Sequence, residues 1–145
     1  MNPSELKEFL DEKVILYNNK NFIDSDPVQI PHLYTQKEDI EIAGFLAATI
    51  AWGNRKMIIN NSHKLMQIMG NSPYDFVMNH KEIHLEKLSN FVHRTFNATD
   101  AVTFIKALQH IYKNNPDLES VFTKHIENNS TQKSISEFKK TFFEI

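Results

Sequence analysis

Apolar residues recur along most of this chain at intervals of three and four, the spacing that lines one face of an α-helix. The most regular run consists of Ala101, Phe104, Ile105, Leu108, Ile111 and Tyr112. Further helices are predicted over residues 3–17, 36–51, 55–69, 73–79, 85–94 and 116–126, and from 135 onwards. No alternating strand pattern bounded by hairpin turns competes with them. The sequence therefore predicts an all-α fold, a multi-helix bundle in which residues 1–145 form one domain.

Side chains that cap helix N-termini precede most of these stripes, at Asn2, Thr35, Asn54, Ser72 and Asn97. Four of them have an acid three residues later, the spacing of a capping box: Asn2 with Glu5, Thr35 with Glu38, Ser72 with Asp75, and Asn97 with Asp100. Gly53 follows the last turn of the most apolar helix, where a left-handed glycine often ends a helix. Trp52 to Arg55 should therefore form a tight corner between two helices.

Both ends of the chain carry apolar faces that need a covering surface. The N-terminal face, which consists of Leu6, Phe9, Leu10, Val14 and Tyr17, is expected to pack on the rest of the domain. The C-terminal stripe of Phe138, Phe142 and Ile145 has no polar tail after it. We therefore expect the N-terminal portion of a longer protein, with the stripe covered by the missing C-terminal half or by a helical protein partner.

Composition excludes several classes of protein. No stretch approaches the roughly 18 apolar residues of a membrane span, and the N-terminus is not a signal peptide, so a cytoplasmic protein without membrane contact is expected. The absence of cysteine excludes disulfides, thiolate metal sites and cysteine nucleophiles. With only three isolated glycines, a glycine-rich phosphate loop is excluded too. The net charge of −2 means that any nucleic-acid contact has to be local.

Two cations stand at a predicted helix start. Arg55 and Lys56 follow the cap Asn54, where the helix macrodipole is already positive, so they are unfavourable there unless an anion such as a phosphate binds. The alternative is that both side chains reach into water, which costs a few tenths of a kcal/mol. Trp52 either packs in the core or is an exposed stacking residue, and Arg94 either bonds helix carbonyls or binds an anion.

A metal site would need acids and histidines to converge. The candidates are Asp24, Asp26, His32, Asp39, Glu41 and His63, with His80 and His84 as a further pair four residues apart. None of these groups has the spacing of a known ligand motif, and helix caps explain several of the acids. No metal and no other cofactor is predicted.

Three segments resemble a known family: DPVQIPH at 26–32, EIAGFLAATIAWGNRKMI at 41–58 and HRTFN at 93–97. They are similar to an uncharacterised bacterial family of Bacteroidetes, spirochaetes and some proteobacteria, whose longer members have C-terminal halves similar to helix-hairpin-helix DNA glycosylases of the endonuclease III type. The resemblance implies a fold like the N-terminal part of those glycosylases. It also implies that the corner formed by Trp52, Gly53, Asn54 and Arg55 approaches DNA. Charge placement adds Lys56 and Arg94 to this nucleic-acid site.

The hairpin that carries the catalytic lysine or aspartate in that superfamily has no counterpart here, so no catalytic residue is predicted and the chain alone should not cleave a glycosidic bond. The leading hypothesis is that the chain is part of a DNA-binding, glycosylase-like repair protein, which would be an enzyme only at full length. A helical protein-interaction module without enzymatic activity is the alternative, and a metal-dependent hydrolase is third.

Overall fold

The computed structural model describes residues 1–127 and 130–144, and within them it contains helices and no β-strand. The α-helices are α1 (Pro3–Tyr17), α2 (Lys20–Ile23), α3 (Lys37–Thr49), α4 (Arg55–Ile68), α5 (Pro73–Asn79), α6 (Glu82–Leu85), α7 (Ala98–Asn114), α8 (Leu118–Thr123) and α9 (Gln132–Phe142). Three short 3-10 turns are η1 (Pro27–Gln29), η2 (Pro31–Leu33) and η3 (Glu86–Leu88). The predicted all-α fold is confirmed. None of the described helices is both long and apolar enough to cross a membrane.

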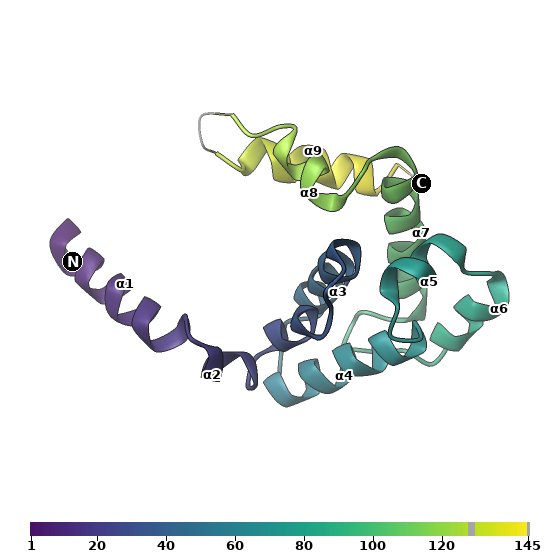
Figure 1. The fold of residues 1–145 in the computed structure, drawn as a ribbon, viewed down its shortest axis with the longest axis horizontal. Coiled ribbons are helices and arrows are strands. Elements are labelled where there is room, and N and C mark those ends of the chain that lie inside the picture. The colour runs from purple at the N-terminus through teal and green to yellow at the C-terminus, as the bar shows by residue number, and fades with distance from the viewer. Residues whose placement is uncertain (128–129, 145) are drawn as a thin grey trace.

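In the view of Figure 1, helix α3 lies at the centre of the molecule, with α4 below it, α5 and α7 to its right, and α8 and α9 above it. Its inward positions Ile42, Ala43, Leu46 and Ala47 are buried, as its nearly all-round apolar sequence requires. The regular stripe of α7 supplies the next part of the same core through Ile105, Leu108 and Ile111.

The predicted helix caps are confirmed at three positions and wrong at two. Asn2, Asn54 and Asn97 each accept a hydrogen bond from the first turn that follows them. The capping box at Thr35 does not form, because α3 begins one residue later than predicted, after Gln36, and Thr35 is then out of register with the first free amides. Ser72 makes no side-chain capping bond either.

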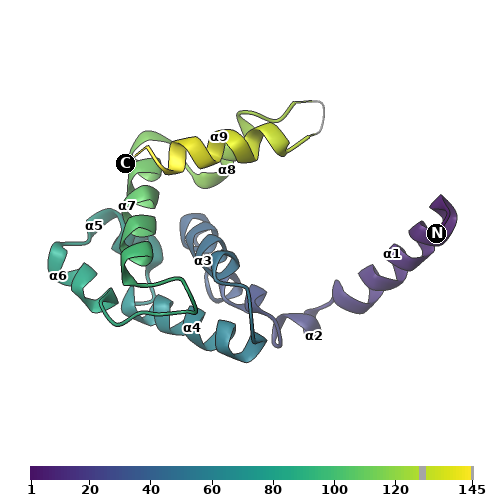
Figure 2. The ribbon, with the colours of Figure 1, turned by 180° about the vertical axis from the view of Figure 1, so that it is seen from behind.

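The predicted helix over residues 85–94 is largely wrong. After η3 the chain leaves helical geometry and runs alongside α4 as an irregular segment (Figure 2). The backbones of His93 and Phe96 pair with each other at 2.8 and 2.9 Å, and Arg94 between them has φ +55°. A left-handed residue and a tight turn cannot continue an α-helix.

At the C-terminal end, the apolar stripe is covered within the chain. Phe142 is 2% exposed and Phe138 is also buried. Their rings pack against Phe45 of α3 and Phe104 of α7, and Phe138 stacks on Phe122 of α8. The expectation that Phe138 and Phe142 lack a covering surface is therefore wrong, because α8 folds α9 back onto the core. Ile145 lies outside the described residues.

At the other end, α1 projects from the body of the molecule in both views (Figures 1 and 2). It has no buried residue, and its apolar side chains are exposed. The predicted docking of this helix on the rest of the domain is wrong, because the chain continues into α2 in a direction that keeps α1 away from the core.

Candidate functional site

The structure brings two polar corners together: the predicted corner at Trp52 to Arg55, and a second one at residues 93–97, between η3 and α7. Arg94 places its guanidinium carbon 4.7 Å from the centre of the Trp52 ring, a cation–π contact. The buried ring of His93 connects Trp52 to α4. Its Nε2–H donates to the Trp52 carbonyl at 3.2 Å, and its Nδ1 accepts from the Asn61 side-chain amide at 2.8 Å. Residues 41 positions apart in sequence therefore form one surface.

Trp52 is 40% exposed, so its ring is neither a core residue nor fully solvated. Arg94 covers part of it, and the His93 ring meets it edge-on at 6.1 Å. Of the two roles that the sequence left open, the structure favours an exposed aromatic surface. Arg94 is held by an aromatic ring, and no hydrogen bond from it to a helix carbonyl is present among the described residues.

Gly53 is required by the close packing of the two corners. Its φ of +109° is a conformation that residues with a side chain rarely adopt. A β-carbon there would also lie 3.0 Å from an Arg94 guanidinium nitrogen and 3.1 Å from its Cδ. The predicted positive φ is confirmed, but α3 ends at Thr49, so the residue forms the corner and does not cap the helix directly.

The start of α4 completes the site. Asn54 Oδ1 accepts from the Met57 amide at 3.1 Å, as predicted for a cap. Arg55 is partly neutralised, because its guanidinium lies 4.0 Å from the Asp26 carboxylate and 5.9 Å from the Phe22 ring centre. Lys56 is exposed and makes no ion pair with the described residues. The helix start therefore presents one unneutralised cation and one that is partly neutralised.

A sequence signal for this surface is the distribution of acids, which the overall charge of −2 conceals. Residues 42–74 and 87–99 contain no aspartate or glutamate, and these two segments pack on each other around His93. Together they carry Arg55, Lys56, Lys64, Lys87 and Arg94. Three of these cations, Arg55, Lys56 and Arg94, belong to the corner, and one acid, Asp26, lies beside Arg55, so the corner is locally cationic and such fields attract anions.

A pocket of about 490 Å³ opens next to the corner, between η1, α3 and the start of α4. Most of its wall is apolar and comes from Pro27, Val28, Pro31, Ala48, Ala51 and Ile58. Asp26 and Arg55 are its charged lining residues. The pocket can therefore accept an apolar or flat group while a polar part stays near the Asp26–Arg55 pair.

The acids and histidines weighed as metal ligands do not converge. Asp39 accepts the Tyr74 amide at 2.8 Å and so caps α5 from α3, while His63 contacts the Gln29 side chain at 3.2 Å. The His84 Nδ1 accepts the Lys81 amide, which leaves its proton on Nε2 in the neutral ring. His80 uses its Nδ1–H on the carbonyls of its own helix. The two rings are therefore not arranged as a pair of ligands.

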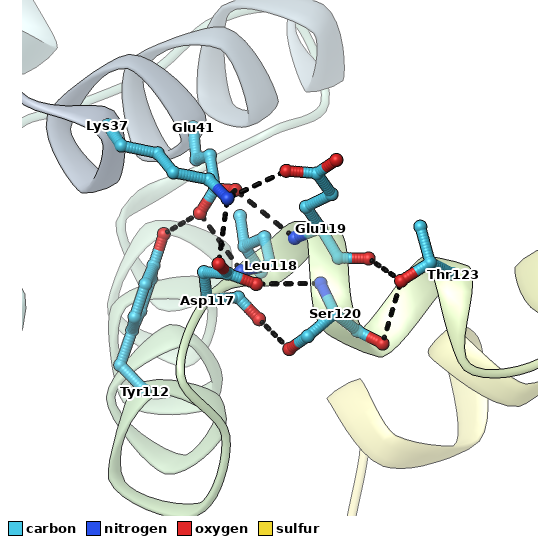
Figure 3. A network of polar contacts seen from close by, with 8 residues as sticks. All are labelled: Lys37, Glu41, Tyr112, Asp117, Leu118, Glu119, Ser120 and Thr123. Atoms are coloured by element: carbon cyan, nitrogen blue, oxygen red, sulfur yellow. Dashed lines mark hydrogen bonds and ion pairs between the residues drawn. The ribbon is translucent and has the colours of Figure 1, made fainter.

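A different acidic group does converge, at the start of α8 (Figure 3). Oxygen atoms of Glu41, Asp117 and Glu119 lie within 4.8 Å of one another. The Lys37 ammonium already lies among them, 2.7 Å from both Asp117 and Glu119. These hydrogen bonds raise the pKa of Lys37, and the same contact with Lys37, followed by the Ser120 amide, lowers the pKa of Asp117.

Glu41 has a structural role within this group. Its carboxylate accepts the amides of Leu118 and Glu119 at 2.9 and 3.2 Å and the Tyr112 hydroxyl at 2.8 Å (Figure 3). Burial and then the bond to Glu41 raise the pKa of Tyr112. The cluster fixes α3, α7 and α8 to one another with its charge already balanced by an internal cation, and it therefore carries no metal assignment.

Fold and site together define an all-α protein with a cationic, aromatic corner. The chain belongs to the family described as Protein of unknown function (DUF2400), whose model matches residues 26–145. The matched segment contains both corners, whereas α1 precedes it. Comparisons with curated proteins and with solved structures gave no match.

Proposed function

We propose that this chain binds DNA through the corner formed by Trp52, Gly53, Asn54, Arg55 and Lys56 together with Arg94. The observation that carries the proposal is the exposed Trp52–Arg94 contact beside the N-terminus of α4. A half-exposed tryptophan offers a stacking surface, and adjacent cations suit phosphates.

Each part of the corner has a distinct role in this proposal. Lys56 and the first amides of α4 meet a phosphate, because a helix N-terminus favours anions. Arg94 lies over the Trp52 ring, and its N–H groups contact a second phosphate. Trp52 lies against a base. His93 contacts no ligand, and its hydrogen bond to the Trp52 carbonyl positions Trp52.

The resemblance of three segments to the bacterial family extends this proposal to a glycosylase-like repair role for a longer protein. No catalytic step is assigned to residues of this chain. The alternative, a protein-interaction module without enzymatic activity, is favoured by one observation, the exposed apolar face of α1.

The test is a salt series of binding measurements by fluorescence anisotropy, with single-stranded and duplex DNA. Lys56→Ala and Arg94→Ala should each weaken binding regardless of sequence and reduce the slope of log K against log salt by about one, the result of one lost phosphate contact. Lys139→Ala is the matched control, because it removes one exposed positive charge from α9, on the opposite side of the molecule from α4 (Figure 1).

Trp52→Ala should cost about 1–3 kcal/mol of binding if the ring stacks on a base. Urea unfolding of each variant separates lost affinity from lost stability. If Lys56→Ala and Arg94→Ala remain folded and bind as the wild type does at every salt concentration, the corner is not the binding site.

A further inference from the structure

Helix α1 presents an apolar face without an intramolecular partner. Leu6, Phe9, Leu10, Val14 and Tyr17 lie on one side of the helix, and each is between 44% and 56% exposed. A 15-residue helix is only marginally stable in water unless it packs on something, even with the capping box that Asn2 and Glu5 form here. Contiguous apolar surface of this kind marks an interaction site.

The chain also contains an apolar groove at the root of this helix. The pocket beside α3 adjoins a second one of about 580 Å³ in the elbow between α1 and η2, and the two share Asp26 and Val28. We call them together the elbow groove. Its apolar wall comes from Phe22, Ile23, Val28, Pro31, Ala48 and Ala51.

The elbow keeps α1 from folding onto its own groove. The Asn18 amide bonds the Val14 carbonyl at 2.8 Å, and the Asn19 side chain bonds the Leu16 carbonyl at 2.8 Å. The rings of Tyr17 and Phe22 also meet edge-on at 5.4 Å across the junction. For α1 to fold onto the groove of its own chain, the backbone would have to reverse its direction at Asn18 and Asn19, and these contacts would have to break. The groove is therefore accessible mainly to another molecule.

We propose that α1 is an exchanged arm: in a two-fold dimer, the apolar face of each α1 occupies the elbow groove of a second copy. The area supports reciprocal exchange. One arm of this length supplies on the order of half of the roughly 800 Å² per partner of a standard interface, and each chain buries both its arm and its groove when two copies exchange. The contact is self-complementary, as a two-fold interface requires.

The charges of α1 and of the elbow groove are compatible with the exchange of α1 between two copies. The arm carries Glu5, Glu8, Asp11 and Glu12 against Lys7 and Lys13, so it is net acidic. Lys20 lines the elbow groove, where it can meet these acids, whereas the other cation of the lining, Arg55, is partly neutralised by Asp26. Lys13 lies over the Phe9 ring at 5.0 Å, so its stem extends the apolar face.

The first test is the mass of the full chain in solution, by light scattering and sedimentation equilibrium. The wild type should be dimeric and Phe9→Asp monomeric, with the body still folded because α1 has no buried residue and Phe9 is far from the Tyr17–Phe22 contact at the end of the helix. The control is Ile15→Asp, on the opposite face of α1 and 79% exposed, which should remain a dimer. A monomeric wild type, or a dimer that persists in Phe9→Asp, overturns the proposal.

The second test uses the absence of cysteine from the chain. Leu10→Cys protein mixed with Ala48→Cys protein should form a disulfide-linked heterodimer under mild oxidation, whereas Ile15→Cys with Ala48→Cys should not. The double variant Leu10→Cys/Ala48→Cys, oxidised at high dilution, shows whether the arm folds back onto the elbow groove of its own chain. Cross-links that form only within one chain show that the arm covers its own groove, and that result contradicts exchange.

Discussion

At the scale of single residues, the candidate site depends on a glycine and a histidine that bind nothing themselves. Gly53 lets the chain turn beneath Arg94, and the buried His93 ties the Trp52 carbonyl to Asn61 of α4. Both residues lie next to the contact between Arg94 and Trp52. We therefore expect the geometry of this corner to be sensitive to substitutions that remove no charge.

Gly53→Ala should destabilise the fold by about 1–3 kcal/mol, because it forces an alanine to φ +109° and its methyl group against Arg94. Gly70→Ala is the matched control, with φ +69° and no atom within 4 Å of the added carbon. Urea unfolding should show a larger loss for Gly53→Ala, and the fluorescence of Trp52 should change in that variant alone. Equal losses and unchanged fluorescence would show that Arg94 does not constrain this position.

At the scale of elements, α3 organises its neighbours through carboxylates as well as through its apolar faces. Asp39 caps the start of α5, and Glu41 accepts two amides at the start of α8. Two acids of the cluster predicted in the first third, Asp39 and Glu41, therefore act as long-range caps, whereas Asp26 caps η1 locally. Acids at helix N-termini are favourable because they satisfy free amides and oppose the positive end of the macrodipole.

The Lys37–Asp117 contact predicts a pH dependence. The pKa of Asp117 is lowered from 3.8 in the folded chain, so its contribution to stability is present above about pH 4 and is lost as the pH falls through the lower folded value. The raised pKa of Lys37 acts in the opposite sense, with a contribution present below its ordinary 10.5 and lost as the pH rises through the folded value.

Asp117→Asn tests the acid side. Asparagine still caps α8, where Asp117 Oδ1 accepts from Ser120, so the substitution removes charge and keeps the cap. Urea midpoints measured from pH 2 to 7 should fall less steeply below pH 4 in the variant than in the wild type. Parallel curves would mean that this ion pair contributes nothing to acid sensitivity.

At the scale of the whole molecule, an aromatic cluster joins α9 to the centre. Phe138 and Phe142 contact rings from α3, α7 and α8, so the C-terminal helix belongs to the same core as the central helix. Because these rings cover Phe138 and Phe142, the prediction that the C-terminal stripe lacks a covering surface within the chain is wrong.

Phe142→Ala should cost about 3–5 kcal/mol of unfolding free energy, the usual loss for a buried phenylalanine. Phe143→Ala, at a neighbouring exposed ring, should cost much less. Thermal and urea unfolding of the two variants compare them directly. Similar small losses would show that α9 is not part of the folded core.

The sequence by itself determined the all-α class, most helix positions, the caps at Asn2, Asn54 and Asn97, and the positive φ of Gly53. It also singled out Trp52 and Arg94 separately. These features depend on residues within about four positions of each other, the range of helix periodicity and capping.

Tertiary structure decided the rest: Asp39 as the cap of α5, the Lys37 network, the burial of Phe142, the exposure of α1 and the contact of Arg94 with Trp52. Each of these joins or separates residues far apart in sequence. A local pattern states that a side chain needs a partner or a covering surface, but it does not say which distant segment supplies it. That choice depends on how all the apolar faces pack at once.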